Sequence, residues 1–199
     1  MKNEKSIDNR ITSFLTLAGS LLIIGTVLLT IFQLIGQSKT LSENRDTVEK
    51  LYNLIPTVHS GAQEDRVDMN MPALEMDGEN FIGIIEIPFY EITLPVCGSW
   101  NKHKISSFPC RYYGNLYDSS LIIGGSDAEG HFDFIKTTSV GDAVFVTDMT
   151  GGQYFYQVEW IEKYDEISGE VLMEKSADLV LFTKNTYSFD YTVVFCSMR

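Results

Sequence analysis

The feature that most constrains this chain is a long run near its N-terminus without a single charged residue. Between Arg10 and Lys39 there is no Asp, Glu, Lys or Arg, and residues 11–36 are ITSFLTLAGSLLIIGTVLLTIFQLIG. A helix rises ~1.5 Å per residue, so this run is longer than the ~30 Å hydrocarbon core of a bilayer. It predicts a membrane-spanning helix over residues 11–37. A cleaved secretory signal is the competing interpretation, but its apolar region would span ~7–15 residues before a small-residue cleavage site, which residues 33–39 lack.

The two flanks of this helix bear on its orientation. Basic residues lie on both sides of the span, so the bias of positive charge hardly distinguishes the two orientations. The flanks differ strongly in size, because residues 1–10 precede the helix and nearly all of the remaining chain follows it. We therefore expect a cytoplasmic tail at residues 1–10 and a single-pass protein of the cell membrane with an extracytoplasmic C-terminal domain.

The chain as a whole is acidic but apolar enough to fold. It has a formal net charge of -12, with 44% hydrophobic and 12% aromatic residues. This composition predicts a packed core rather than a disordered acidic tail. No cluster of Lys or Arg offsets the negative charge, which would repel phosphates, so we expect no nucleic-acid partner.

Residues 38–80 are predicted to form a helical stalk and a linker. Residues 38–54 contain good helix formers and no Pro or Gly, and the run stops just before Pro56. An apolar stripe follows one face of this helix: Leu41, Val48, Leu51 and Leu54. So short a stripe favours packing on the helix's own domain, and a coiled-coil dimer is the alternative. Residues 56–80 mix charges with Pro and Gly and show little periodicity, which is typical of a linker.

From Phe81 onward the pattern changes to short β-type runs separated by turn residues. Seven runs are rich in Ile, Val, Phe and Tyr: FIGIIEI, EITLPV, SLIIGG, AVFVT, QYFYQVEWIE, DLVLFT and YTVVF. Residues 148–152 (DMTGG) indicate a hairpin, and residues 165–177 indicate a loop with a short helix. About seven or eight short strands with few helices predict a mainly β domain over residues 81–199, folded as a closed barrel or a sandwich.

The order of several short motifs resembles one known family. The motifs are residues 82–88 (IGIIEIP), 94–96 (LPV), 109–112 (PCRY), 121–125 (LIIGG), 140–142 (VGD) and 178–183 (DLVLFT). In order and spacing they are similar to those of the sortases, the membrane-anchored cysteine transpeptidases of Gram-positive bacteria. The resemblance implies a closed sortase-like β-barrel and a role in anchoring surface proteins to the cell wall. The partners it implies are a sorting-signal peptide or an active sortase.

The three catalytic positions of the family carry other residues in this chain. A sortase uses a Cys thiolate as nucleophile, a His to protonate the leaving amine and an Arg at the oxyanion. By the resemblance, Ser126 stands at the His position, Lys184 at the Cys position and Tyr191 at the Arg position. This implies a catalytically inactive member that acts as a peptide-binding or accessory module. The alternative is an active transpeptidase or peptidase with a rearranged Ser126/Lys184 centre, which requires a Lys base whose pKa falls from ~10.4 to roughly 7–8.

The remaining candidate residues have structural interpretations. Cys97, Cys110 and Cys196 lie in or beside apolar runs, as buried structural Cys do, and an exported chain could bridge two of them. The preferred pair is Cys110 with Cys196, because both stand at strand ends. His131 is interpreted as structural or surface, and Trp100 as packing. No His, Cys or carboxylate group has metal-ligand spacing, so neither a metal nor a cofactor is expected.

Overall fold

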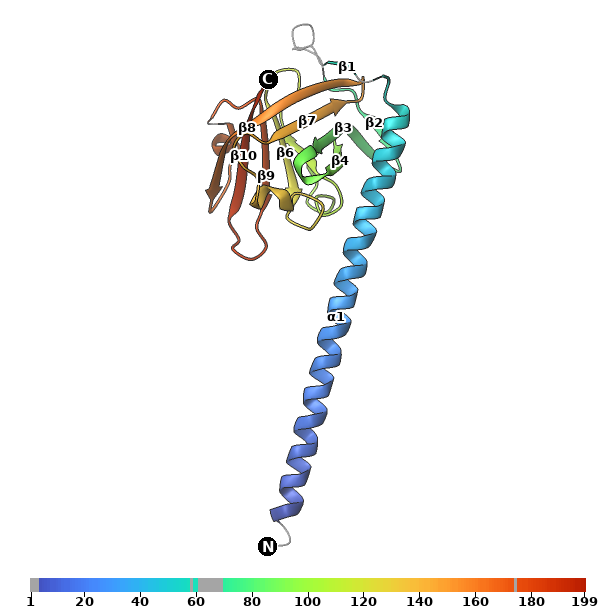
Figure 1. Cartoon of the computed structure of the whole chain (residues 1–199), viewed down its shortest axis with the longest axis vertical. Coiled ribbons are helices and arrows are strands. Elements are labelled where there is room, and N and C mark those ends of the chain that lie inside the picture. The colour runs from blue at the N-terminus through green and yellow to red at the C-terminus, as the bar shows by residue number, and fades with distance from the viewer. Residues whose placement is uncertain (1–3, 58, 61–69, 174) are drawn as a thin grey trace. The chain divides into compact units, whose positions relative to one another are not determined.

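The chain forms two compact units, one helical and one made mainly of strands. In this computed structural model the units are residues 1–39 and residues 40–199. The residues that the structure describes are 4–57, 59–60, 70–173 and 175–199. Figure 1 shows the strands gathered in the second unit.

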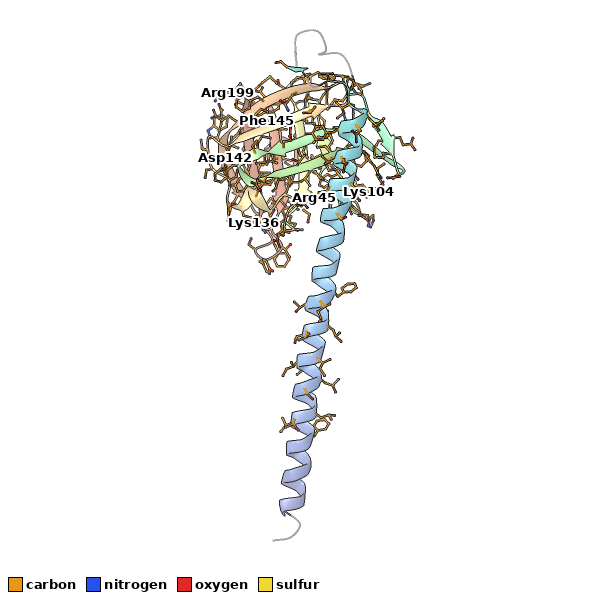
Figure 2. All side chains as sticks on the ribbon, turned by 45° about the vertical axis from the view of Figure 1, so that its right-hand side comes forward. Arg45, Lys104, Lys136, Asp142, Phe145 and Arg199 are labelled. Atoms are coloured by element: carbon orange, nitrogen blue, oxygen red, sulfur yellow. The ribbon has the colours of Figure 1, made fainter. Side chains whose placement is uncertain are left out.

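A single helix, α1 (Glu4–Leu54), contains the uncharged run. Its segment Phe14–Phe32 has a mean hydropathy of 2.3 and is 0% buried. Figure 2 shows the side chains of this segment projecting from both sides of the helix. Apolar side chains exposed in this way suit a helix surrounded by hydrocarbon rather than water, so the segment fits a single-pass membrane anchor. The helix continues to Leu54 because no Pro interrupts it before Pro56.

The second unit is built around one ten-stranded sheet within the described residues. The strands are β1 (His59–Ser60), β2 (Leu74–Met76), β3 (Glu79–Ile87), β4 (Ile92–Cys97), β5 (Cys110–Tyr113), β6 (Leu121–Ser126), β7 (Ala143–Asp148), β8 (Gly152–Tyr164), β9 (Leu179–Lys184) and β10 (Tyr191–Met198). The short helices of this unit are η1 (Pro88–Tyr90), η2 (Asp133–Lys136) and α2 (Gly169–Met173). The hairpin predicted at residues 148–152 joins β7 to β8, and the loop predicted at residues 165–177 carries α2.

The sheet closes into a barrel through β7. The strand order is β1-β8-β10-β9-β6-β5-β4-β3-β2, and β7 pairs with both β3 and β8, which are distant in that order. This double pairing joins the two sides of the sheet, so no free edge remains there. The strands β3 to β10 make up the closed barrel. The predicted fold class is confirmed, although the sequence pattern does not mark β5, whose CRYY run is short and mixes apolar with charged residues.

The barrel interior holds the main hydrophobic core. Along β8, buried and half-buried residues alternate from Gly152 to Val158, as expected for a strand with one face toward a core. In β6 and β9, by contrast, every residue except the last is buried. Such continuous burial is typical of parallel strands covered on both faces, and β6 pairs with β9 in parallel.

The C-terminal end of α1 packs on the barrel within the second unit. Val48, Leu51 and Ile55 form a second hydrophobic cluster with Phe81 of β3. The apolar stripe of the predicted stalk therefore packs on its own domain at Val48 and Leu51. Leu54, which was expected to share that face, is 60% exposed.

The segment predicted as a linker, residues 56–80, is partly integrated into the barrel. Its strand β2 pairs with β3, with Leu74 opposite Phe81, and Met71 is buried in the main core. The barrel therefore begins before Phe81. Isolated apolar residues in a charged stretch do not reveal this packing, because their partners lie elsewhere in the chain. Residues 61–69, also predicted as linker, lie outside the described residues.

Candidate functional site

The candidate site begins where β6 and β9 end together. Their parallel register places Gly125 beside Thr183 and Ser126 beside Lys184. β10 runs antiparallel to β9 and places Tyr191 on the other side of Lys184. The three residues singled out by the resemblance thus lie in one row across three neighbouring strands. The Thr183 hydroxyl donates a hydrogen bond of 2.9 Å to the Gly125 carbonyl, which ties the two strand ends together.

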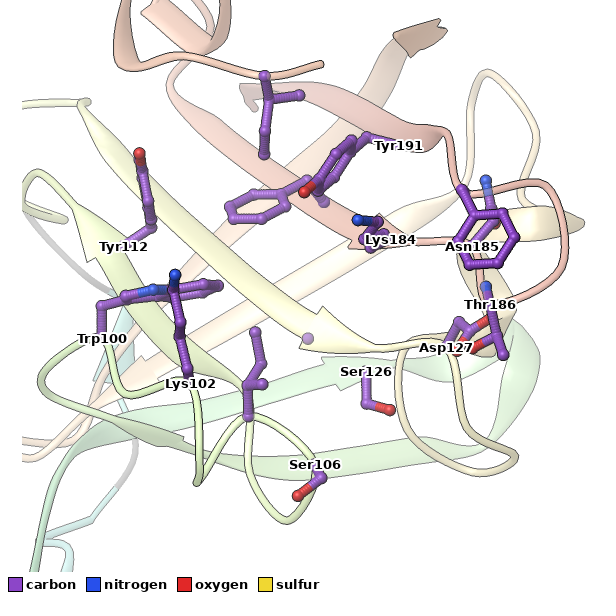
Figure 3. A pocket seen from close by; sticks show the side chains of 15 residues that line it. Trp100, Lys102, Ser106, Tyr112, Ser126, Asp127, Lys184, Asn185, Thr186 and Tyr191 are labelled. Atoms are coloured by element: carbon purple, nitrogen blue, oxygen red, sulfur yellow. Dashed lines mark hydrogen bonds between the residues drawn. The ribbon is translucent and has the colours of Figure 1, made fainter. Parts of the chain in front are cut away.

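These strand ends open onto a groove with a volume of about 670 Å³. That volume is within the ~300–1,000 Å³ typical of ligand sites. One wall of the groove is aromatic. Trp100 meets Tyr112 edge to face with ring centroids 5.1 Å apart, and its ring centroid is 5.6 Å from that of Phe182. Figure 3 shows Trp100 and Tyr112 on one side of the groove and Lys184 and Tyr191 on another.

Two glycines of β6 let the aromatic rings approach the strand this closely. A Cβ atom at Gly124 would lie 2.6 Å from ring atoms of both Trp100 and Phe182. A Cβ atom at Gly125 would lie 2.3 Å from the Phe132 ring. Both distances are shorter than real Cβ atoms tolerate, so the glycines of the LIIGG run have a packing role at the site.

The acidic residue beside the groove is already paired within the protein. Asp127 accepts hydrogen bonds from the Thr186 backbone N–H at 2.8 Å and from Lys136 Nζ at 3.0 Å. Burial would raise the pKa of Asp127, but the hydrogen bonds from Thr186 and Lys136 outweigh it and hold the pKa below its usual value. The ionised Asp127 therefore fastens the loop between β9 and β10 to the end of β6.

Two lysines line the groove. Lys184 is exposed, and its Nζ lies 5.4 Å from the centre of the Tyr191 ring in a cation–π arrangement. Lys102 belongs to the loop between β4 and β5 and also lines the groove. Because Asp127 is paired with Lys136, the groove presents positive charge in a chain whose net charge is -12.

Ser126 and Lys184 are neighbours in register, but their side chains do not form a catalytic pair in this structure. Ser126 Oγ accepts a hydrogen bond of 3.3 Å from the Ala128 N–H. Figure 3 shows the Ser126 hydroxyl group directed away from Lys184. A Ser–Lys centre needs a hydrogen bond of ~2.6–3.2 Å between the two side chains and a desolvated Lys. The exposed Lys184 side chain does not meet the second condition.

The three cysteines lie away from the groove. Cys97, Cys110 and Cys196 are buried and free, and Cys110 and Cys196 belong to different hydrophobic clusters, so the preferred Cys110–Cys196 disulfide is wrong. Cys196 lies in the main core, whereas Cys110 lies in the second cluster beside Cys97. A position at a strand end did not reveal which side of the sheet each thiol faces. Burial also raises the pKa of the Cys196 thiol, which makes it a poor nucleophile.

His131 is a buried structural residue. It is 1% exposed, and its ring centroid lies 5.6 Å from that of Phe132. Burial lowers the pKa of His131 to about 4, so the imidazole is neutral at pH 7. Of its two interpretations, the structural one is confirmed. Within the part of the chain that the structure describes, no group of three or more His, Cys, Asp or Glu side chains could hold a metal ion.

The sequence patterns do not mark the loop between β4 and β5 as a wall of the site. Trp100, interpreted as packing, both packs on Phe182 and lines the groove, and Lys102 and Ser106 line it too. A loop has no periodicity that shows where it folds back. The available signal was the glycine pair at the end of β6, which indicates a close approach by bulky groups.

Comparison with known structures identifies the fold. Sortase C1 from Streptococcus agalactiae matches with a TM-score of 0.52 and 19% identity, over 63% of this chain and 71% of that chain. Sortase A from Corynebacterium diphtheriae matches with a TM-score of 0.51 and 14% identity, over 82% of this chain and 84% of that chain. Sortase E1 from Streptomyces coelicolor, solved with a tripeptide in its active site, matches with a TM-score of 0.50 and 15% identity, over 60% and 88%. No protein-family model and no curated protein matches the chain. The chain therefore has the sortase fold.

Proposed function

We propose that this chain is a membrane-anchored sortase-fold protein that binds peptide segments in its groove without cleaving them. In this role it serves as an accessory module in the anchoring of surface proteins, with a sorting-signal peptide or an active sortase as its partner. The observation that carries the proposal is the groove at the neighbouring ends of β6 and β9, which has an aromatic wall and is also lined by Ser126, Lys184 and Tyr191.

The lining of the groove supports peptide binding. Trp100 and Tyr112, which are half-buried, offer aromatic surface to the side chains of a peptide, and the buried Phe182 supports the Trp100 ring. The Ser126 and Ser106 hydroxyls offer polar contacts to the peptide backbone. The match to sortase E1, which holds a tripeptide in its active site, suggests the same class of ligand.

The absence of a thiol from the described groove lining supports binding without cleavage. All three cysteines are buried elsewhere, so the family's acyl-enzyme has no Cys on which to form. The Ser126 hydroxyl is directed away from Lys184, so it lacks the adjacent base that would activate it.

An active peptidase or transpeptidase with a Ser126/Lys184 centre is the second candidate function. The parallel register favours it, because it brings the two residues to adjacent strands. A change of the Ser126 rotamer would redirect its hydroxyl, and Tyr191 would donate a hydrogen bond to the oxyanion. A neutral phenol stabilises that charge less than a guanidinium does, so turnover would be slow.

We place residues 1–10 in the cytoplasm and the barrel on the outer side of the cell membrane, joined by one spanning helix. The apolar segment Phe14–Phe32 supports a membrane anchor. Protease added to intact protoplasts should digest the barrel and spare an N-terminal epitope tag. Digestion of the tag with an intact barrel would reverse the proposed orientation.

Calorimetric titration of the full chain in detergent micelles with sorting-signal-like peptides tests the proposed binding. We expect the wild type to bind and Trp100→Ala to lose at least about tenfold in affinity, because its ring is the centre of the aromatic wall. Trp160→Ala is the matched control, because Trp160 is 44% exposed and lies outside the groove lining. Absence of binding, or equal binding by Trp100→Ala, would contradict the proposal.

A further inference from the structure

Cys97 and Cys110 stand opposite one another where β4 and β5 pair. They are register partners in the parallel contact between these strands. Adjacent strands lie ~4.8 Å apart, and a disulfide joins residues whose Cα atoms are ~4.4–6.8 Å apart. Both side chains belong to the second hydrophobic cluster, so they face the same side of the sheet. The backbone thus presents the two thiols to each other at disulfide spacing.

The two thiols also interact directly. The Cys97 and Cys110 side chains share a hydrogen bond, which raises the pKa of Cys97 and lowers the pKa of Cys110. A hydrogen bond from the Asn101 backbone further favours the thiolate of Cys110. The two sulfurs are therefore close enough to exchange with one another once either of them is ionised.

We propose that Cys97 and Cys110 form a redox-reactive dithiol that closes into an intramolecular disulfide on meeting a small-molecule disulfide. The thiolate of one of the two cysteines attacks one sulfur of that reagent, whose S–S bond breaks and releases the first thiol. The sulfur of the other cysteine then displaces the second thiol, and an S–S bond forms between the two residues. Two electrons and two protons pass from the pair to the reagent, so the exchange balances.

The loop enclosed by this bond is the wall of the groove that carries Trp100 and Lys102. Its ends already meet, because the Cys97 N–H donates a hydrogen bond of 2.8 Å to the Pro109 carbonyl. The disulfide would therefore fix the loop with little displacement and would restrict the unfolded chain. The two thiols are 3% and 0% exposed, so the reaction requires the loop to open and should be slow.

Peptide mapping of the full chain in detergent micelles tests this assignment. The protein is incubated with oxidised glutathione, alkylated and digested with trypsin without reduction. Lys102 and Lys104 are cleavage sites between Cys97 and Cys110, so their disulfide appears as two cross-linked peptides that dithiothreitol separates. We expect this cross-link between Cys97 and Cys110, and we expect the peptide that contains Cys196 not to be cross-linked. Glutathione adducts without a cross-link, cross-links to Cys196, or two unreacted thiols after unfolding in the reagent would overturn the proposal.

Thermal stability gives a second readout, which compares the two redox forms of the same protein. The oxidised wild type should melt roughly 5–10 °C above the reduced wild type, because the bond removes conformations from the unfolded chain. Cys196→Ala is the matched control and should keep both the cross-link and the shift. Cys97→Ala should lose both. An unchanged or lowered melting temperature on oxidation would contradict a native-like disulfide, whereas failure of peptide binding in both redox forms would count against the proposed function alone.

Discussion

β6 and β9 each consist of a buried segment and a last residue that lines the groove, and packing constrains the residue type much more strongly in the buried segment than at the last residue. Residues 121–125 and 179–183 are buried, whereas Ser126 and Lys184, the last residues of the two strands, line the groove. Packing from both faces determines which residues fit the buried parts. The open ends contribute little packing, so the barrel does not depend on which polar residues stand there. The fold therefore places few constraints on the two side chains at the strand ends that line the groove.

The largest difference in stability between the buried segments and the strand ends should come from shortening a buried side chain of β9. Leu181 is 0% exposed, so Leu181→Ala should lower the free energy of unfolding by about 2–5 kcal/mol. Lys184→Ala, at the open end of the same strand, should change it by less than about 0.5 kcal/mol. Chemical denaturation of the two variants measures both values, and equal losses would break the comparison.

The buried His131 should make the stability of the barrel decrease in acid. Its pKa is about 4 in the folded chain against 6.5 for an ordinary His, so only the unfolded chain gains the proton as pH falls between these values. The free energy of unfolding should therefore be highest above about pH 6.5 and should decrease toward pH 4. The contribution of His131 to this decrease should be on the order of 3 kcal/mol. His131→Leu should remove that part of the decrease, as measured by denaturation at about pH 7 and about pH 4.5. The same pH dependence in both proteins would contradict the assignment.

A methyl group added at Gly125 should lower the stability of the barrel by an intermediate amount. Gly125→Ala should destabilise the barrel by about 1–3 kcal/mol, because the new Cβ would displace the Phe132 ring. Gly169→Ala in α2 is the control, since its Cβ would meet only Met173, at 3.5 Å. Thermal melts compare the two variants. If Gly125→Ala melted no lower than its control, the packing role of this glycine would be wrong.

The smallest effect should follow from removing the Ser126 hydroxyl. Ser126→Ala loses the acceptor for the Ala128 N–H at the half-buried end of β6, so the stability loss should be about 1 kcal/mol or less. Its affinity for peptide should stay within a few-fold of wild type in the calorimetric titration. A loss of stability as large as that of Leu181→Ala would show that the strand end belongs to the core.

Most strands were predictable because they are contiguous apolar runs, whose pattern depends on local residues alone. The closure of the sheet into a barrel was implied only by the resemblance to sortases, because it depends on the pairing of β7 with two strands that are distant in the sheet order. The three site positions Ser126, Lys184 and Tyr191 were implied by the resemblance to sortases, and the structure gives the register that brings them together. The pairing of Cys110 was not predictable, because it depends on which face of the sheet each sulfur occupies. Trp100 was missed as a groove residue for a similar reason, since its place depends on how a loop without periodicity folds back onto β6.

Mass spectrometry of sorting-signal-like peptides incubated with the full chain tests the central claim most directly. The claim is that the groove binds a peptide and leaves it intact. We expect the peptides to be recovered uncleaved after prolonged incubation with the wild type, under the conditions at which the calorimetric titration detects binding. Cleavage by the wild type that disappears in both Ser126→Ala and Lys184→Ala would contradict the account and would establish an enzyme with a Ser–Lys centre.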